Sequence, residues 1–141
     1  MAGNSSFFYT NPTPEQTPGL LAELNTAIAD TTALLSEYTA VTKTWASTVN
    51  IDWSDALTQR ITLGGNTTFT FSNARDGGKY VLEITQDSTG NRIFTLPSNV
   101  RYGTYIPSVS PTITANKTDK IGFIYNSTAN KYDLVAVAYG F

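Results

Sequence analysis

The chain contains no cysteine and no histidine, and these two absences exclude most of the side-chain chemistry on which enzymes depend. Without cysteine there is no disulfide and no thiolate nucleophile, and without histidine there is no imidazole base. The same two residue types are the usual ligands of zinc and copper, so we expect no metal site of that kind and no cofactor. The sequence therefore predicts a protein that is not an enzyme.

Charged side chains are also scarce, with nine Lys and Arg against eleven Asp and Glu in 141 residues. Nucleic-acid binding depends on clustered basic side chains that neutralise phosphates, and here Arg75, Lys79, Arg92 and Arg101 are scattered. We expect no nucleic-acid partner. No apolar run is long enough to cross a bilayer, so no membrane insertion is expected.

A pair of nearby carboxylates is the one feature of the sequence that could suggest catalysis. Asp52 and Asp55 flank Trp53, and a glycoside hydrolase requires two facing carboxylates at a defined separation. Both aspartates are expected at a strand end and turn, where capping of backbone amides is the simpler role. We therefore expect no catalytic residue.

Residues 1–18 are predicted to form an extended arm. The segment contains Pro12, Pro14 and Pro18. Prolines at this density oppose a regular helix. Phe7, Phe8 and Tyr9 form an apolar triplet in an otherwise polar arm, and we expect this triplet to anchor the arm in another surface. The alternative is that these aromatic residues fold back onto the protein's own domain.

Residues 19–46 are predicted to form one helix that brings subunits together. Thr17 is a suitable N-cap and Pro18 suits the first helical position. An apolar seam with alternating three- and four-residue spacing follows, and Thr31 belongs to it. Its other members are Leu21, Leu24, Ile28, Leu35 and Tyr38. Thr42 and Trp45 can prolong the pattern.

This seam is typical of a short parallel coiled coil. The mixture of Leu and β-branched residues at its core positions favours a trimer over a dimer, so we expect a homotrimer. The alternative is a single amphipathic helix that packs on the sheet of its own subunit.

Residues 47–141 change to a period of two, interrupted by turn signals that contain Gly, Asn and Asp. We expect a mainly β domain, a sandwich of seven or eight antiparallel strands with a jelly-roll-like arrangement. The stretch Asp76–Val100 is predicted to be a hairpin. The last strand is apolar on both faces, which predicts either a central position or contact with another subunit.

Turn residues near this predicted hairpin have clear structural roles. Gly90 is expected to supply a positive φ, and Asp87 to accept hydrogen bonds from turn amides. The Gln86 side chain is expected to pair with backbone. Arg92 and Glu83 are expected to form an ion pair across the hairpin.

Residues 61–141 carry a pattern of recurring strand and turn motifs. It comprises an N-x-T-φ-x-φ strand, a D-G turn, a Y-x-L-x-I-x-Q-D strand, a T-G-x-R turn and a further strand that ends at proline. The matching residues are Asn66, Thr68, Phe69, Phe71, Asp76, Gly77, Tyr80, Leu82, Ile84, Gln86, Asp87, Thr89, Gly90, Arg92 and Pro97. In this pattern the chain resembles a small β domain of bacteriophage virion structural proteins, including tail fibres and other appendages. Leu96 and Tyr102 stand where members of that family often carry Trp.

The resemblance implies a structural protein of the virion. The role would be capsid decoration or head fibre, or a tail or neck appendage, with the arm held by other virion proteins. An alternative is a module of a tail fibre that binds a host surface glycan. Aromatic residues that could stack on sugar rings are Trp53, Tyr102 and Tyr105, although such residues also build cores and interfaces.

Overall fold

The computed structural model of the protein describes residues 16–141, which fall into two units. Helix α2 as far as Leu35 belongs to the first unit, and residues from Ser36 to Phe141 form the second. The predicted anchor residues Phe7, Phe8 and Tyr9 lie outside the described residues.

Helix α2 spans Gln16–Glu37, so it begins within the segment predicted to be arm. Its sequence is rich in Ala and Leu, which favour helix. Its first turn carries no acidic residue and its last turn no basic one, so no side-chain charge at either end stabilises the helix through its dipole. A lone helix of this kind is marginal in water, and its stability must come from packing.

The helix ends before residue 46, and the predicted extension to Trp45 is wrong. Val41–Lys43 forms strand β1, which pairs in parallel with strand β3 (Thr58–Leu63). The boundary between the units therefore lies near residue 36. β-Branched residues such as Val41 and Thr42 favour a strand where a neighbouring ladder is available, and the heptad pattern cannot reveal that neighbour.

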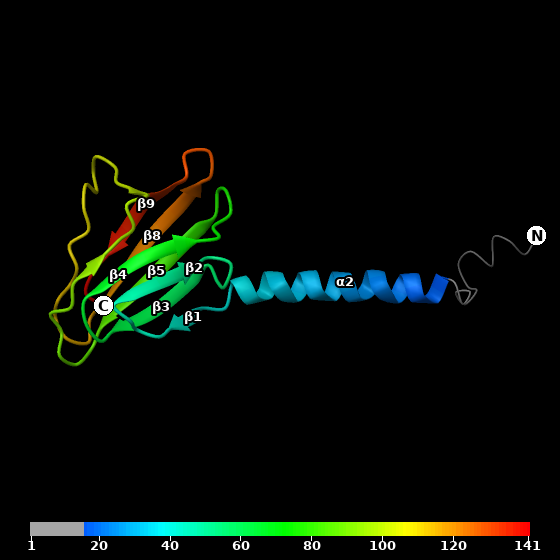
Figure 1. Ribbon diagram of the computed structural model, residues 1–141, viewed down its shortest axis with the longest axis horizontal. Helices are drawn as coiled ribbons and strands as arrows, with labels where there is room; N and C mark the ends of the chain where they lie inside the picture. Colours follow the sequence, from blue (N-terminus) through cyan, green and yellow to red (C-terminus); the bar gives the residue numbers. More distant parts are fainter. Residues whose placement is uncertain (1–15) are drawn as a thin grey trace, which may run out of the picture. The chain divides into compact units, whose positions relative to one another are not determined.

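The second unit is mainly β, as expected, and its strands form two sheets (Figure 1). The six-stranded sheet has the order β1-β3-β5-β8-β9-β7, and the three-stranded sheet has the order β2-β4-β6. The remaining strands are β2 (Thr48–Asp52), β4 (Thr67–Ser72), β5 (Lys79–Gln86), β6 (Phe94–Thr95), β7 (Val100–Arg101), β8 (Thr118–Asn126) and β9 (Lys131–Ala138).

The first six strands alternate between the two sheets. Each strand pairs in parallel with the next strand of its own sheet, β1 with β3 and β3 with β5, β2 with β4 and β4 with β6. The prediction of an antiparallel domain is therefore wrong, because antiparallel ladders join only β5 to β8 and β8 to β9 among the described strands. The mixed six-plus-three arrangement also differs from the eight-stranded double Greek key of a jelly roll.

The predicted hairpin at Asp76–Val100 is likewise wrong, because β5 and β6 lie in different sheets. The Gln86 side chain does pair with backbone as expected: its Nε2 donates to the carbonyl of Arg92, and its Oε1 accepts from the Arg92 N–H, both at 2.9 Å. The Gln86 side-chain amide thus forms the hydrogen bonds that a neighbouring strand would otherwise form. The chain therefore turns away from β5 and enters the other sheet.

The turn itself is held by Asp87. Its Oδ1 accepts from the Gly90 N–H at 2.9 Å, and its Oδ2 accepts from the Arg92 guanidinium at 2.8 Å. Gly90 has a φ of +70°, and a Cβ there would lie 2.6 Å from the carbonyl oxygen of Ile113, so only glycine fits. The ion pair expected between Arg92 and Glu83 is absent, because Glu83 pairs with Arg60 and Lys120 instead.

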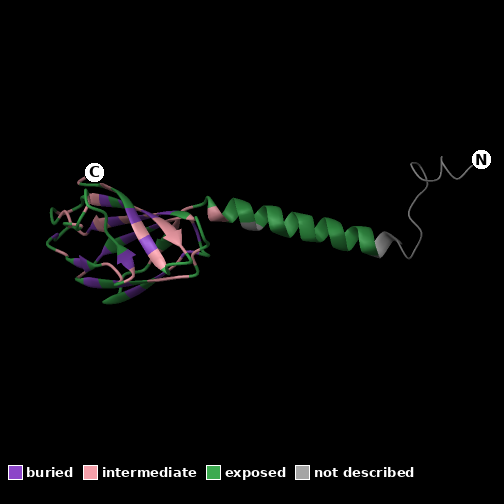
Figure 2. Cartoon of the chain, turned by 90° about the horizontal axis from the view of Figure 1, so that it is seen from above, coloured by how far each residue is buried: buried purple, intermediate pink, exposed green. Residues whose placement is uncertain are grey.

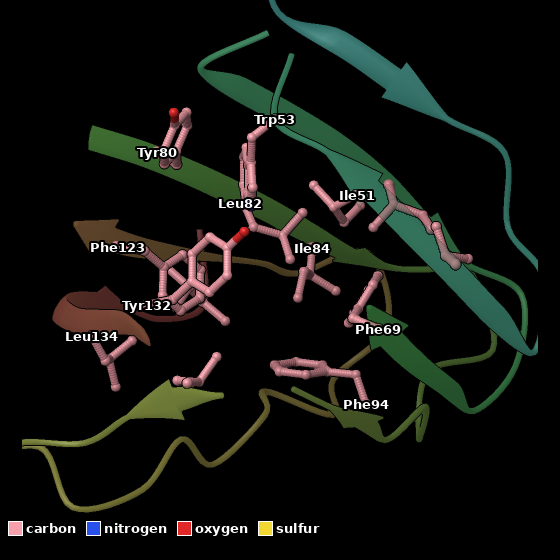
Figure 3. Packing of buried hydrophobic residues seen from close by; sticks show 14 of the residues in the cluster. Ile51, Trp53, Phe69, Tyr80, Leu82, Ile84, Phe94, Phe123, Tyr132 and Leu134 are labelled. Carbon is pink, nitrogen blue, oxygen red and sulfur yellow. The ribbon is translucent and has the colours of Figure 1, made fainter. Parts of the chain in front are cut away.

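An aromatic cluster fills one end of the core between the sheets (Figure 3). The Trp53 ring lies 4.7 Å from that of Tyr80, and Phe71 lies 5.2 Å from Phe123 and 5.0 Å from Tyr132. Burial raises the pKa of Tyr132 to about 12. The cluster joins β4, β5, β8 and β9 to the turn that follows β2, so both sheets depend on it.

Trp45 provides a direct test of the local packing after β1. Its ring lies over Gly65, where a Cβ would approach Trp45 to 2.7 Å, and its Nε1 donates to Thr67 Oγ1 at 2.8 Å. We expect Gly65→Ala to displace the ring and to lower the free energy of unfolding by about 1–3 kcal/mol, measured by urea titration of tryptophan fluorescence. Gly103→Ala is the control, since a Cβ there meets nothing within 4 Å. Equal stability of the two variants would contradict this packing.

Candidate functional site

The predicted seam of α2 is exposed in the single chain. Leu21, Leu24, Ile28 and Leu35 are each more than half exposed, and Figure 2 shows exposed residues along the helix. Tyr38 is also exposed, but it lies one residue beyond the end of α2. The seam is therefore an unpartnered apolar surface.

Thr31 fits this seam despite its hydroxyl group. Its Oγ1 donates to the carbonyl of Ala27 at 2.9 Å, one helical turn back. Because this hydrogen bond satisfies the hydroxyl within the helix, the methyl group can face an apolar partner without leaving a polar group unpaired. Thr31 is thus compatible with a buried interface.

Two residues that the sequence reasoning missed widen the seam. Leu20 and Leu34 are both more than half exposed. Together with Ala27 they recur every seven residues, directly beside the seam. This spacing was the signal that could have identified them. The apolar stripe of α2 thus includes three of every seven residues, as is usual for helices in a bundle. The narrow seam of a two-stranded coiled coil includes only two of every seven residues.

The acidic side chains of α2 lie away from this stripe. Glu23, Asp30 and Glu37 also recur every seven residues, at a position that a coiled coil leaves in solvent. Glu37 is anchored in the β unit, since its carbonyl accepts from the Leu57 N–H at 2.8 Å and its carboxylate pairs with Arg75 at 2.8 Å. The helix therefore has one apolar and one acidic face.

The structure does not bring the three predicted glycan-contact residues together. Trp53 is only 2% exposed and belongs to the core, so it cannot stack on a sugar at the surface. Tyr102 is partly exposed, and burial raises its pKa. Tyr105 is 98% exposed in a turn that the Ile106 N–H closes on the Gly103 carbonyl at 3.2 Å. Only the two tyrosines remain as candidates.

Asp52 and Asp55 both have structural partners, and Asp52 caps a backbone amide as predicted, whereas Asp55 forms an ion pair. Asp52 Oδ1 accepts from the Ser54 hydroxyl at 2.6 Å and the Ser54 N–H at 2.9 Å, and these bonds hold the pKa of Asp52 below its usual range. Asp55 pairs with Lys43 at 2.5 Å. A glycosidase acid needs a raised pKa, so Asp52 is unsuited to that role.

Ion-paired carboxylates make the stability of the fold depend on pH in the acid range. The Arg92 guanidinium lowers the pKa of Asp87, and the Arg101 guanidinium lowers that of Asp133. A carboxylate whose folded pKa is depressed stabilises the fold above its unfolded pKa of about 4, and that contribution disappears as the pH falls through the folded value. We expect the melting temperature to fall between about pH 5 and pH 2, with a shallower fall in Asp87→Asn, measured by calorimetry. An unchanged slope in that variant would contradict the assignment.

The outer surface of β9 remains exposed in the single chain. A β-bulge places Gly122 opposite Ala136 and Phe123 opposite Leu134, so Val135 has no opposite residue. Val135 on β9, and Tyr139 and Phe141 just after it, are 50%, 47% and 62% exposed. The prediction that this strand contacts another subunit stays a prediction.

Residues 16–141 contain no group of three or more acidic side chains placed to hold a metal ion. Within the same residues, α2 is not apolar enough to cross a membrane.

No protein-family model and no curated protein matches the chain. A solved structure described as that of a chaperone-substrate complex is similar in part, with 16% identity and a TM-score of 0.38. The similarity covers 72% of this chain and 18% of that one. A likeness at this level does not establish a shared fold.

Proposed function

We propose that the protein is a non-enzymatic structural component of a bacteriophage particle, which forms a homotrimer through a coiled coil of α2. The N-terminal arm anchors it to other virion proteins, and the β unit is the part presented at the surface. The role is capsid decoration, a head fibre, or a tail or neck appendage. The motif pattern in residues 61–141 supports the phage assignment.

The main observation that supports oligomer formation is the exposed apolar stripe of α2. Fully burying one Leu or Ile side chain contributes about 1.5–3 kcal/mol, and the stripe holds six such residues. They are Leu20, Leu21, Leu24, Ile28, Leu34 and Leu35. A partner helix that covers them stabilises a segment that is otherwise marginal. The three-of-seven width favours more than two helices, which supports a trimer.

The experiment on the anchor replaces Phe7, Phe8 and Tyr9 with Ser in the full chain. The protein should remain folded and oligomeric, but its incorporation into particles should fall by at least about tenfold, since three large apolar side chains leave the contact. Immunoblotting of purified particles measures the incorporation. The matched control replaces Asn4 and Asn11 with Ser and should incorporate normally. Normal incorporation of the triple variant would contradict the anchor.

A second candidate function is recognition of a host surface glycan, which the exposure of Tyr105 favours. An aromatic ring presented at a closed turn can stack on a sugar. Saturable binding on a glycan array that disappears in Tyr105→Ala and persists in Tyr139→Ala would support this function.

A further inference from the structure

Strand β4 is paired along one side but only at its beginning on the other. β2 pairs with Thr68–Ser72, whereas β6 pairs only with Thr67 and Thr68. The Thr67 N–H points to the β6 side, where it donates to the Ile93 carbonyl at 3.0 Å. Since strand residues alternate, Phe71 directs its N–H and C=O to the same side, where β6 offers no opposite residue.

A groove lies beside this open part of β4. β6 ends at Thr95, and Leu96–Asn99 continues as the far wall, so a cavity of about 640 Å³ remains. This volume is within the range of ligand-binding sites. The β4 groove is lined by Thr68, Phe69, Thr70, Phe71, Thr95, Leu96, Pro97, Ser98 and Asn99.

The lining of the β4 groove specifies the chemistry of an occupant. None of its residues carries a charge, so it provides no counter-ion for a charged ligand. Phe71 and Leu96 are partly buried against the core and offer apolar contact, while Thr95 adds a hydroxyl group. The Thr70 hydroxyl already donates to Asn50 Oδ1 at 2.9 Å. An occupant should therefore be uncharged, with apolar side chains and its own backbone donors and acceptors.

The open edge is held rigidly. The Phe71 ring contacts those of Trp53, Phe123 and Tyr132 at centroid distances of 5.3, 5.2 and 5.0 Å. An edge that is formed before binding loses little conformational entropy on association. β4 is the central strand of its sheet and β2 is an edge strand, whose last carbonyl, that of Asp52, already accepts from the Gln59 side chain at 2.6 Å.

We propose that the β4 groove binds an extended, uncharged segment of a polypeptide other than this chain, which adds a strand beside Phe71. Backbone hydrogen bonds to the unpaired edge supply affinity, and alternate apolar side chains of the segment contact Phe71 and Leu96. Addition of a strand to a sheet edge is an established mode of peptide recognition. No residue of α2 lines the groove, and the proposal does not depend on the phage assignment.

The test uses the full-length protein and the hexapeptide acetyl-Thr-Val-Thr-Val-Thr-Val-amide in an NMR titration. We expect saturable shifts at Phe69–Phe71 and Thr95–Asn99, with slower hydrogen exchange of the Phe71 amide. Two further peptides are N-methylated at alternate residues, one on each backbone edge. Methylation of the edge that faces β4 should weaken binding by about tenfold or more, and methylation of the other edge should not.

Protein variants provide an independent readout on the same peptide. Thr95→Lys places a long charged side chain at the rim of the β4 groove and should weaken binding by about tenfold. Thr48→Lys is the matched control, because Thr48 is also exposed but lies on β2, away from the groove lining. Its affinity should be unchanged.

Four outcomes of the experiments with the hexapeptide would overturn the proposal. The first is that the peptide shows no saturable binding, and the second is that the two N-methylated peptides bind with equal affinity. The third is that the shifts occur at Thr48–Asp52 instead of the groove. The fourth is that maltotriose displaces the peptide, which would make the site a glycan site. Binding by a peptide of residues 3–14 of this chain, and not by the hexapeptide, would also overturn it, since the occupant would then be the arm of another copy.

Discussion

Substituting Asp for both Leu24 and Ile28 is expected to convert the proposed trimer to a monomer. Each side chain is more than half exposed on the apolar stripe of α2, so the β unit does not require either one. In a trimer, the two changes place six carboxylates in one apolar interface, and each unpaired buried charge costs several kcal/mol. Sedimentation equilibrium should give the mass of three chains for the original protein and of one chain for the variant.

A matched control separates loss of the interface from loss of the helix. Thr26→Asp with Ala29→Asp adds the same charge to α2 at positions outside the stripe, and this variant should remain trimeric. Circular dichroism should show less helix in the monomeric variant, because a lone helix of this length is marginal. A Leu24, Ile28 variant with the mass of three chains, or an original protein with the mass of one, would contradict the proposed coil.

Replacement of Trp53 by Ala is expected to remove about 3–5 kcal/mol from the free energy of unfolding, as is usual for a large buried aromatic residue. Trp53 is 2% exposed and its ring contacts those of Phe71, Tyr80 and Phe123. The free energy of unfolding of a small domain is only about 5–15 kcal/mol, so this loss approaches the whole stability of the β unit. Urea unfolding followed by far-ultraviolet circular dichroism measures it.

Tyr105→Ala is the opposite case, because Tyr105 is 98% exposed. Its substitution should change the free energy of unfolding by less than about 0.5 kcal/mol. If Tyr105→Ala were as damaging as Trp53→Ala, the assignment of Trp53 to the core and of Tyr105 to the surface would be wrong.

The sequence pattern predicted strand content and local turns but not how the strands are connected. A period of two marks one buried face in parallel and antiparallel strands alike, so the pairs β1–β3 and β2–β4 could not be recognised as parallel. A polar turn that contains glycine can likewise reverse a strand within one sheet or carry it into the other. At Asp87–Arg92 the outcome depends on the Gln86 side chain, whose partner is known only in the folded chain.

The candidate site was predictable to a similar extent. The heptad spacing of Leu21, Leu24 and Ile28 gave the seam directly, and the same spacing would have given Leu20 and Leu34. The exposure of single aromatic residues could not be read in this way, since nothing local distinguishes Trp53 in the core from Tyr105 in a turn. That difference arises from contacts between strands that are far apart in the chain.

The pairing of β5 with β8 has a consequence for the order of synthesis. Residues 79–85 of β5 find their antiparallel partners at 118–124, so the centre of the six-stranded sheet is incomplete until the later strands have left the ribosome. Folds dominated by such distant contacts form slowly, and their unpaired edges are prone to aggregation meanwhile. Helix α2 is synthesised before any of these strands. Nascent chains on neighbouring ribosomes can therefore present their helices to one another before any β unit is complete.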